Sequence, residues 1–406
     1  MNAGGAAVRA LEYRFSAPRW WLARHTGRPA LAVRRSGVGL RTLVPPEPPG
    51  PDWVSLRVRL AGICGSDVAL LRGRSGPQLS PFVSFPAVLG HEVLGVAEAG
   101  ALAGRRVVLD PFLGCLTRSL DPCPACAEGQ SAWCHRFAEG ALAPGMLLGY
   151  CRGLPGGWGE RLVAHGSQLH AVPDALDDDT AVLAEPLAVS LHAVLAEPVA
   201  PGSRVLVIGA GTIGLCVLAA LSLLRAPAES VVVARHPLQA RLATALGASV
   251  VVAGVRAAEE EATRRGWGRR WPGLMGTTGW TGGFDRVFDA VGSASSLAAA
   301  LRLARAGGAV DLLGCAGGLP DLDLTPVWAH ELRLRGSCGY GPEPAFGGAH
   351  TLACALRLLA SRPDLPLRDL VTHRFPLQGY RAALHAAFAH RESGSVKVVF
   401  APERGA

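Results

Sequence analysis

Three side chains of types that zinc accepts stand at the ends of two expected strands. Cys64 follows the alternating run WVSLRVRLAGICGSD, and His91 and Glu92 follow Gly90 in PAVLGHEVLGVAEAG. Such alternation of apolar and polar residues predicts half-buried strands, and the glycines predict turns where they end. A catalytic zinc keeps about three protein ligands and leaves one position open for water or substrate. We therefore predict a catalytic metal here, in preference to a buried cysteine and a satisfied core histidine.

A glycine-rich motif lies between another expected strand and a helix, in the run VLVIGAGTIGLCVLAALSLL at residues 205–224. Gly209, Gly211 and Gly214 have the G-x-G-x-x-G spacing, which provides a tight turn, a close approach to a pyrophosphate and close helix packing. The phosphates would bind free N–H groups at the helix N-terminus. The run is also long enough to span a membrane, but three clustered glycines argue against that alternative. We predict a dinucleotide-binding turn.

The next expected strand, SVVVARHPLQARLATALGA, bears on the choice of cofactor. NAD enzymes place an acidic side chain about 20 residues after the fingerprint to bind the ribose hydroxyls. Here that position is Ala234, and Arg235 follows it. A small residue leaves room for a 2′-phosphate, and a guanidinium can bind it with two hydrogen bonds. This favours NADP(H) over NAD(H), although Arg235 facing solvent in an NAD site stays an alternative.

Composition limits the class of protein. With 406 residues, 49% hydrophobic and 18% charged, the chain is long enough for two globular domains. The formal charge of +8 comes almost entirely from arginines, which we interpret as a solvated surface; we expect neither a nucleic-acid nor a membrane partner. The N-terminus lacks the pattern of a secretory signal, and ten cysteines then indicate metal binding in a reducing cytoplasm.

The motifs occur together in one known family. GICGSD, LGHE, AEPLAVSLHAV and VIGAGTIG have the order and approximate spacing of the zinc-dependent medium-chain alcohol and polyol dehydrogenases, which the chain resembles from about Val54 to Pro402. The resemblance implies that Cys64 and His91 are zinc ligands and that Glu92 is a ligand or near-ligand. It also places Glu185 of AEPL at the metal, directly or through water. Ser66 then receives the substrate proton, and Asp67 orients the ligand histidine.

A cysteine cluster departs from the family pattern. Cys123, Cys126 and Cys134 match the last three ligands of the family's structural zinc lobe, but the first ligand is expected at Leu120. The nearest candidate is Cys115. A longer loop costs little extra closure entropy, so we favour a complete four-cysteine zinc site, with a three-cysteine or empty lobe as the alternative.

Further cofactor contacts follow from the resemblance. It places Val291, Leu313 and Cys338, at three strand-to-turn junctions, near the nicotinamide half of the cofactor. Lys397 matches a basic position that reaches the pyrophosphate, and a solvated lysine at a strand end is the alternative. The Trp- and Gly-rich insertion at residues 255–283 is expected to form an exposed loop.

The resemblance implies an α/β fold with two domains. A mostly β, GroES-like catalytic domain with the zinc lobe would comprise residues 1–183 and 345–406, and a doubly wound Rossmann domain residues 184–344. The active site is expected in the cleft between them. We expect a zinc-dependent oxidoreductase, present as a homodimer or homotetramer, that interconverts a polyol or another secondary alcohol and its ketone. The alternatives are a zinc-free quinone or enoyl reductase of the same fold and a non-catalytic dinucleotide sensor.

Overall fold

The computed structural model describes residues 7–319 and 321–402, which form two compact units. Unit 1 comprises Met1–Glu185, Gly339–Pro363 and Val371–Ala406, and unit 2 comprises Pro186–Cys338 and Asp364–Leu370. The unit boundaries therefore fall at Glu185 and Gly339, and the short segment Asp364–Leu370 returns to unit 2. In the described ranges, no helix combines the length and the apolar character that a membrane span requires.

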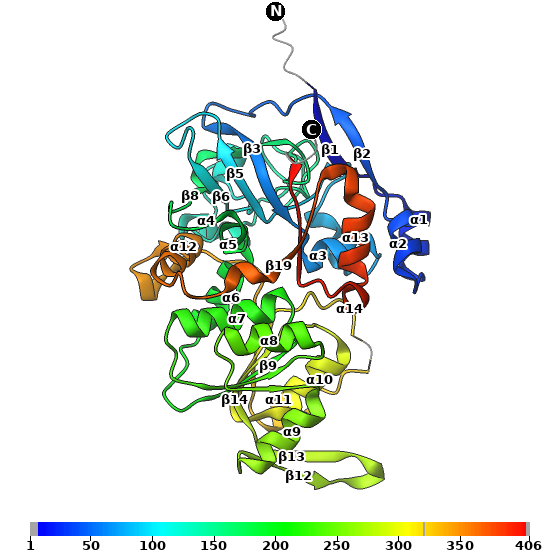
Figure 1. The fold of residues 1–406 in the computed structure, drawn as a ribbon, viewed down its shortest axis with the longest axis vertical. Coiled ribbons are helices and arrows are strands. Elements are labelled where there is room, and N and C mark those ends of the chain that lie inside the picture. Colours follow the sequence, from blue (N-terminus) through cyan, green and yellow to red (C-terminus); the bar gives the residue numbers. More distant parts are fainter. Residues whose placement is uncertain (1–6, 320, 403–406) are drawn as a thin grey trace, which may run out of the picture. The chain divides into compact units, whose positions relative to one another are not determined.

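Unit 2 is built on a six-stranded sheet in the order β11-β10-β9-β14-β15-β16, with every neighbouring pair parallel. This is the order of a doubly wound dinucleotide-binding fold, as predicted. Figure 1 shows helices on both sides of the sheet. The strands are β9 (Arg204–Ile208), β10 (Glu229–Val233), β11 (Val250–Val252), β14 (Phe284–Asp289), β15 (Ala304–Leu312) and β16 (Arg333–Gly336). The helices are α6 (Ala184–Ala196), α7 (Thr212–Leu223), α8 (Pro237–Ala245), α9 (Val255–Arg264), α10 (Ala294–Leu303) and α11 (Thr325–Ala329).

Gly209 and Gly211 lie in the turn between β9 and α7, and Gly214 lies in the first turn of α7. Gly209 has a φ of +99°, a conformation that favours glycine, and a Cβ on Gly214 would lie only 1.8 Å from the carbonyl oxygen of Gly209. Gly211 caps the N-terminus of α7, and a Cβ there would meet nothing within 4 Å. The first and third glycines thus allow the turn and its close packing, and the second leaves the backbone accessible.

The insertion at residues 255–283 is not the exposed loop that we expected. After α9 it forms an antiparallel hairpin of β12 (Gly268–Pro272) and β13 (Thr278–Gly282). Trp280 is buried in the core of unit 2, which gives the hairpin an anchor that composition alone did not reveal.

Unit 1 contains a seven-stranded sheet in the order β19-β20-β3-β5-β6-β8, with β7 also paired to β3, and a three-stranded sheet β2-β1-β4. The strands are β1 (Val8–Tyr13), β2 (Val38–Leu43), β3 (Trp53–Gly62), β4 (Ala87–Val88), β5 (Val93–Ala97), β6 (Arg106–Leu109), β7 (Arg161–His165), β8 (Leu169–Ala171), β17 (Pro342–Glu343), β18 (Ala349–His350), β19 (Val371–Phe375) and β20 (Lys397–Phe400). The helices are α1 (Ala17–Arg24), α2 (Pro29–Arg35), α3 (Gly65–Leu71), α4 (Pro124–Ala127), α5 (Asp178–Val182), α12 (Thr351–Ser361), α13 (Tyr380–Phe388) and α14 (His390–Ser393).

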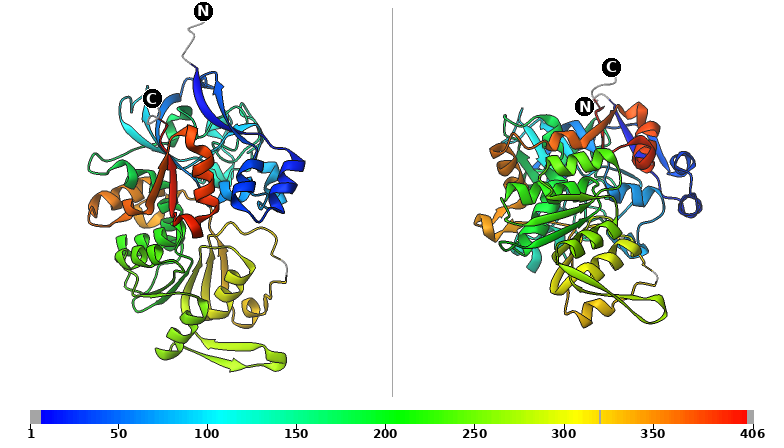
Figure 2. Two further views of the ribbon diagram at one scale, coloured as in Figure 1. Left: turned by 45° about the vertical axis from the view of Figure 1, so that its right-hand side comes forward. Right: turned by 60° about the horizontal axis from the view of Figure 1, so that its bottom comes forward.

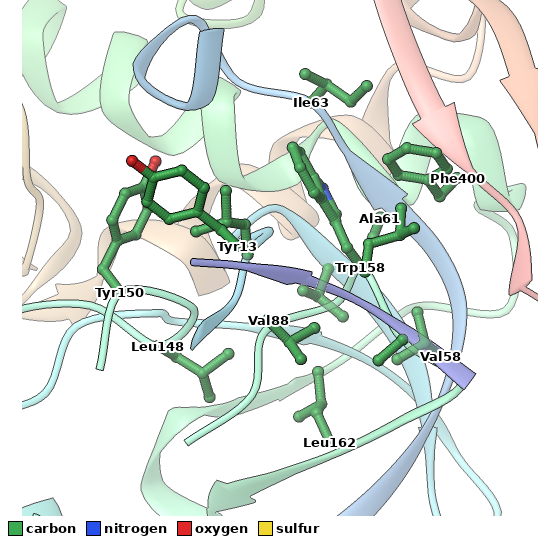
Figure 3. Close-up of a cluster of buried hydrophobic side chains, with 14 of the residues drawn as sticks. Tyr13, Val58, Ala61, Ile63, Val88, Leu148, Tyr150, Trp158, Leu162 and Phe400 are labelled. Carbon is green, nitrogen blue, oxygen red and sulfur yellow. The ribbon is translucent and has the colours of Figure 1, made fainter. Parts of the chain in front are cut away.

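The core of unit 1 lies against the long strand β3. Buried residues of β3 and β7 pack with side chains from loops and from β20, and Figure 3 shows Val58, Ala61, Leu162 and Phe400 among them. Trp158 is fully buried, its ring meets Phe400 edge to face, and its indole N–H donates to the carbonyl oxygen of Gly62. These contacts fix the C-terminal end of β3, where Cys64 follows.

Candidate active site and metal centres

Two turns in unit 1 bring the predicted catalytic ligands together. Cys64 caps the N-terminus of α3 directly after β3, and His91 and Glu92 lie between β4 and β5. The turns are joined because the amide of Gly62 donates to the carbonyl oxygen of Glu92. A Cβ at Gly62 would lie 1.8 Å from Glu92 Oε2, so only glycine leaves room for this carboxylate.

The three ligand atoms fit a metal ion. One donor atom each from Cys64, His91 and Glu92 lies within 4.8 Å of the others, and both His91 and Glu92 are buried. His91 Nδ1 is buried and has no hydrogen-bond partner within residues 7–319 and 321–402. Burial and the Glu92 carboxylate raise the pKa of the Cys64 thiol, so a cation is needed to hold its thiolate there. A thiolate, an imidazole and a carboxylate form a donor set that suits zinc.

Lys397 has a partner that sequence analysis did not foresee. Its ammonium group is buried and donates to both oxygens of Glu92, at 2.8 and 2.6 Å, and to the carbonyl oxygen of Ile63 at 3.2 Å. The side chain is only 3% exposed, so the alternative of a solvated lysine is wrong. The ion pair holds the Glu92 carboxylate in place, and a contact of Lys397 with a cofactor pyrophosphate stays a prediction.

The Asp67 carboxylate holds the turn that carries Cys64. Its carboxylate accepts the amide of Cys64 at 2.9 Å and the phenol of Tyr150 at 2.5 Å, and its Oδ1 lies 3.7 Å from His91 Nδ1. Burial raises the pKa of the Asp67 carboxyl, which His91 and Tyr150 counteract. Burial also raises the pKa of Tyr150 well above its usual value, so the phenol stays neutral and can donate. The position agrees with the predicted role of Asp67 in orienting the histidine.

Glu185 and Ser66 lie around the three ligands but do not join the compact cluster. Glu185 is buried, and Tyr340 donates to it at 3.4 Å. Burial raises the pKa of Glu185 to about 7. His91 opposes this shift, and the Glu92 carboxylate adds to it. The hydroxyl of Ser66 is buried without a hydrogen-bond partner in the described chain, so it is free to bind a ligand group.

The predicted cofactor residues of unit 2 lie at strand ends. Ala234 is buried directly after β10, and Arg235 is exposed beside it. Val291 is half exposed after β14, Leu313 is buried after β15, and Cys338 is exposed beyond β16. In an open parallel sheet, ligands bind outside the carboxyl ends of the strands, where all five residues lie.

The structure brings the four lobe cysteines together despite their unusual spacing. One sulfur each from Cys115, Cys123, Cys126 and Cys134 lies within 4.8 Å of the others. Backbone amides donate to three of these sulfurs. The amide of Cys123 donates to Cys115 Sγ, the amide of Cys115 donates to Cys126 Sγ, and the amide of Arg136 donates to Cys134 Sγ. Burial would raise the pKa of the Cys123 thiol, but neighbouring amides and thiols lower it to about 6. Four converging sulfurs form the donor set of a structural zinc site.

A buried arginine organises the longer loop that carries Cys115. The guanidinium of Arg118, which is 0% exposed, donates to the carbonyl oxygens of Glu139, Leu142, Ala143 and Gly145 at 2.5–3.2 Å. These bonds tie the loop between Cys115 and Cys123 to the segment that follows Cys134. The extra residues are therefore ordered, and Cys115 can reach its partners.

Sequence reasoning missed Tyr150, Tyr340 and Arg118. The two tyrosines lie in the glycine-rich runs GYC and GYG, which gave a signal for a turn but none for a contact with Asp67 or Glu185. Arg118 looks like a surface residue in LTRSLDP, because nothing local shows that four distant carbonyls will surround it. Cys151 and Trp158 are both buried in the core cluster of unit 1.

Two family models match the chain. The alcohol dehydrogenase GroES-like domain matches residues 50–174, which confirms the predicted character of unit 1, and the zinc-binding dehydrogenase domain matches residues 212–361. An L-idonate 5-dehydrogenase of Vitis vinifera is 28% identical over 363 residues, 86% of this chain and 88% of that protein. A sorbitol dehydrogenase of Arabidopsis thaliana is 28% identical over 357 residues, 86% of this chain and 89% of that protein.

Solved structures share the fold. A putative zinc-binding dehydrogenase from Sinorhizobium meliloti 1021, bound to NADP, has a TM-score of 0.70 at 26% identity, with 98% of this chain and 100% of that chain covered. An alcohol dehydrogenase from Escherichia coli CFT073 in complex with NADH has a TM-score of 0.74 at 22% identity, with 98% and 100% covered. Both halves of the chain thus match one enzyme class in sequence as well as in fold, and the chain belongs to the family of zinc-dependent medium-chain alcohol and polyol dehydrogenases.

Proposed function

We propose that this oxidoreductase interconverts a polyol or sugar-derived secondary alcohol and its ketone, with NADP(H) as cofactor. The observation that carries the proposal is the convergence of Cys64, His91 and Glu92 in unit 1. The substrate class rests on the buried carboxylate of Glu185 and on the relatives, which are named as idonate and sorbitol dehydrogenases. A hydroxyl-rich substrate suits a site that offers a carboxylate, a phenol and a serine hydroxyl as hydrogen-bonding groups.

The residues of unit 1 have separate roles in this proposal. Cys64, His91 and Glu92 would hold zinc, with Glu185 at the metal directly or through water; bound zinc acts as a Lewis acid that lowers the pKa of the alcohol. Ser66, whose buried hydroxyl has no hydrogen-bond partner among the described residues, would take the proton of the substrate hydroxyl and pass its own proton outward. Asp67 orients His91, and Lys397 holds the Glu92 carboxylate in position. The nicotinamide supplies the hydride chemistry.

The preference for NADP(H) rests on the end of β10. Ala234 offers no carboxylate to repel a 2′-phosphate, and the exposed guanidinium of Arg235 is placed to pair with one. The glycine turn before α7 offers free backbone N–H groups to the pyrophosphate. We also propose a reducing compartment, since none of the ten cysteines forms a disulfide, and a homo-oligomeric assembly.

Metal analysis combined with a fluorescence assay of NADPH formation tests the proposal. We expect zinc near two per chain, and turnover with polyols or sugar acids that stops when the protein is treated with a chelator. Turnover of quinones or enoyl substrates without metal would instead identify a zinc-free reductase. Cofactor binding with neither metal nor turnover would identify a non-catalytic sensor.

A further inference from the structure

A pair of short helices is inserted between β1 and β2 of unit 1. The helices α1 and α2 contact each other, α2 also contacts α13, and Figures 1 and 2 show the pair at the margin of this unit. Their inward side is apolar and buried, through Ala23, Ala32 and Val33. The pair is thereby held against the unit with one side of α1 turned to solvent.

The outward side of α1 is apolar as well. Trp21 and Leu22 are 57% and 39% exposed, and Pro18 is exposed beside them. At about 100° per residue these three side chains share one face of the helix, opposite the buried Ala23. Arg19 and Arg24 flank this face. We refer to Pro18, Arg19, Trp21, Leu22 and Arg24 as the α1 patch.

The segment around the α1 patch is strongly basic. Between residues 13 and 46 there are seven arginines and no acidic residue, whereas the whole chain has a formal charge of only +8. The arginines are therefore unevenly distributed along the chain. The seven are Arg14, Arg19, Arg24, Arg28, Arg34, Arg35 and Arg41.

The seven arginines differ in whether another residue of the chain binds their charge. Arg14 and Arg41 pair with Glu12, Arg24 donates to the carbonyl oxygen of Gly73, and Arg35 donates to Thr26. The remaining three, Arg19, Arg28 and Arg34, are exposed and have no hydrogen-bond or ion-pair partner in the part of the chain that the structure describes. Their charge is available to an external partner.

We propose that the α1 patch docks on an anionic lipid bilayer. A helix that lies in the membrane interface presents Trp and Leu on one side and arginines at its margins, whose long stems reach the headgroups. Arginines without partners supply the attraction to anionic headgroups. A nucleic acid would also satisfy the charge, but it offers no apolar phase for the exposed Leu22. This docking is independent of the catalytic site and replaces our expectation of no membrane partner.

Sedimentation of the full-length, metal-loaded protein with lipid vesicles tests the proposal. We expect binding to vesicles of phosphatidylcholine that contain phosphatidylglycerol, little binding to phosphatidylcholine alone, and a decline as salt increases. Trp21→Ser together with Leu22→Ser should weaken binding at least about tenfold, which corresponds to burying one large apolar side chain. Arg19→Gln with Arg28→Gln should weaken it about 30-fold, since each arginine near an anionic surface contributes about fivefold.

Matched variants on other surfaces control for these changes. Leu324 and Trp328 in and beside α11 are 51% and 73% exposed, so Leu324→Ser with Trp328→Ser removes the same two side-chain types. Arg152→Gln with Arg256→Gln removes the same charge from exposed positions elsewhere. Both controls should bind vesicles as the native protein does, and all variants should keep the native unfolding temperature and alcohol oxidation.

Each other outcome would overturn the proposal. Absence of binding, or equal binding to charged and uncharged vesicles, would contradict a role for the arginines. Retention of binding in the Trp21 and Leu22 variant would contradict the apolar contact. Binding to duplex DNA but not to vesicles would identify a nucleic-acid surface. Dimers that are lost only in the Trp21 and Leu22 variant would identify a contact between two copies of the chain.

Discussion

Replacing Lys397 by methionine tests how the catalytic ligands are held in place. In the metal-free protein, the change keeps an unbranched side chain of similar length and leaves Glu92, which is 1% exposed, without its cationic partner. Breaking a buried ion pair by removing one partner typically costs about 3–5 kcal/mol, because the remaining charge stays buried. For a domain of the size of unit 1, this predicts a melting temperature lower by roughly 6–20 °C.

Calorimetry of a double-mutant cycle separates the ion pair from general damage. Lys397→Met, Glu92→Gln and the double variant should show a coupling free energy of about 2 kcal/mol, since the double variant buries no unpaired charge. The matched control is Arg256→Met, which removes an ion pair to Glu260 whose side chains are 86% and 66% exposed. This control should change stability by less than about 0.5 kcal/mol.

Two results would refute this reasoning. If Lys397→Met unfolds at the native temperature, the ammonium does not stabilise Glu92. If the coupling free energy is zero, the loss comes from packing and not from charge. The affinity of Lys397→Met for NADPH, measured by fluorescence, tests separately whether the lysine also reaches the pyrophosphate.

Three further changes test other parts of the account. Arg118→Met should destabilise the protein by about 3 kcal/mol or more, because four carbonyl oxygens lose the buried guanidinium that donates to them; an unchanged calorimetric midpoint would contradict this. The free energy of unfolding of the metal-free protein should fall by roughly 3 kcal/mol as pH rises from about 4.5 to about 7. Over this range the folded protein keeps a proton on Glu185, whose pKa is raised to about 7, whereas the unfolded chain releases it. Glu185→Gln should abolish that slope in thermal melts, and a slope that persists would assign it to other groups. Arg235→Ala should weaken NADPH binding far more than NADH binding in titrations; equal losses would remove the argument for NADP(H).

The order of the elements and the ligand turns were predictable from the sequence, because both depend on local patterns. Alternation before Cys64 and around His91 predicted strands that end in glycine turns, and G-x-G-x-x-G between a strand and a helix predicted the first βα turn of unit 2. The six parallel strands of unit 2 follow that prediction.

Contacts between distant segments were not predictable in the same way. Lys397 meets Glu92 across 305 positions, and Tyr150 meets Asp67 across 83 positions, so no local pattern announces either pair. The hairpin at residues 255–283 was missed because Gly and Trp dominate its composition, although the burial of Trp280 gives it a fixed place. The formal charge of the whole chain, +8, also does not show that seven arginines lie between residues 13 and 46.

The most direct test of the central claim is the zinc content and alcohol oxidation of Cys64→Ala, measured on the same preparation. If Cys64, His91 and Glu92 hold the catalytic metal, the variant should keep about one zinc per chain in the four-cysteine lobe, remain folded, still bind the nicotinamide cofactor and lose turnover. A variant that retains two zinc ions per chain, or that oxidises the alcohol at the native rate, would contradict the account.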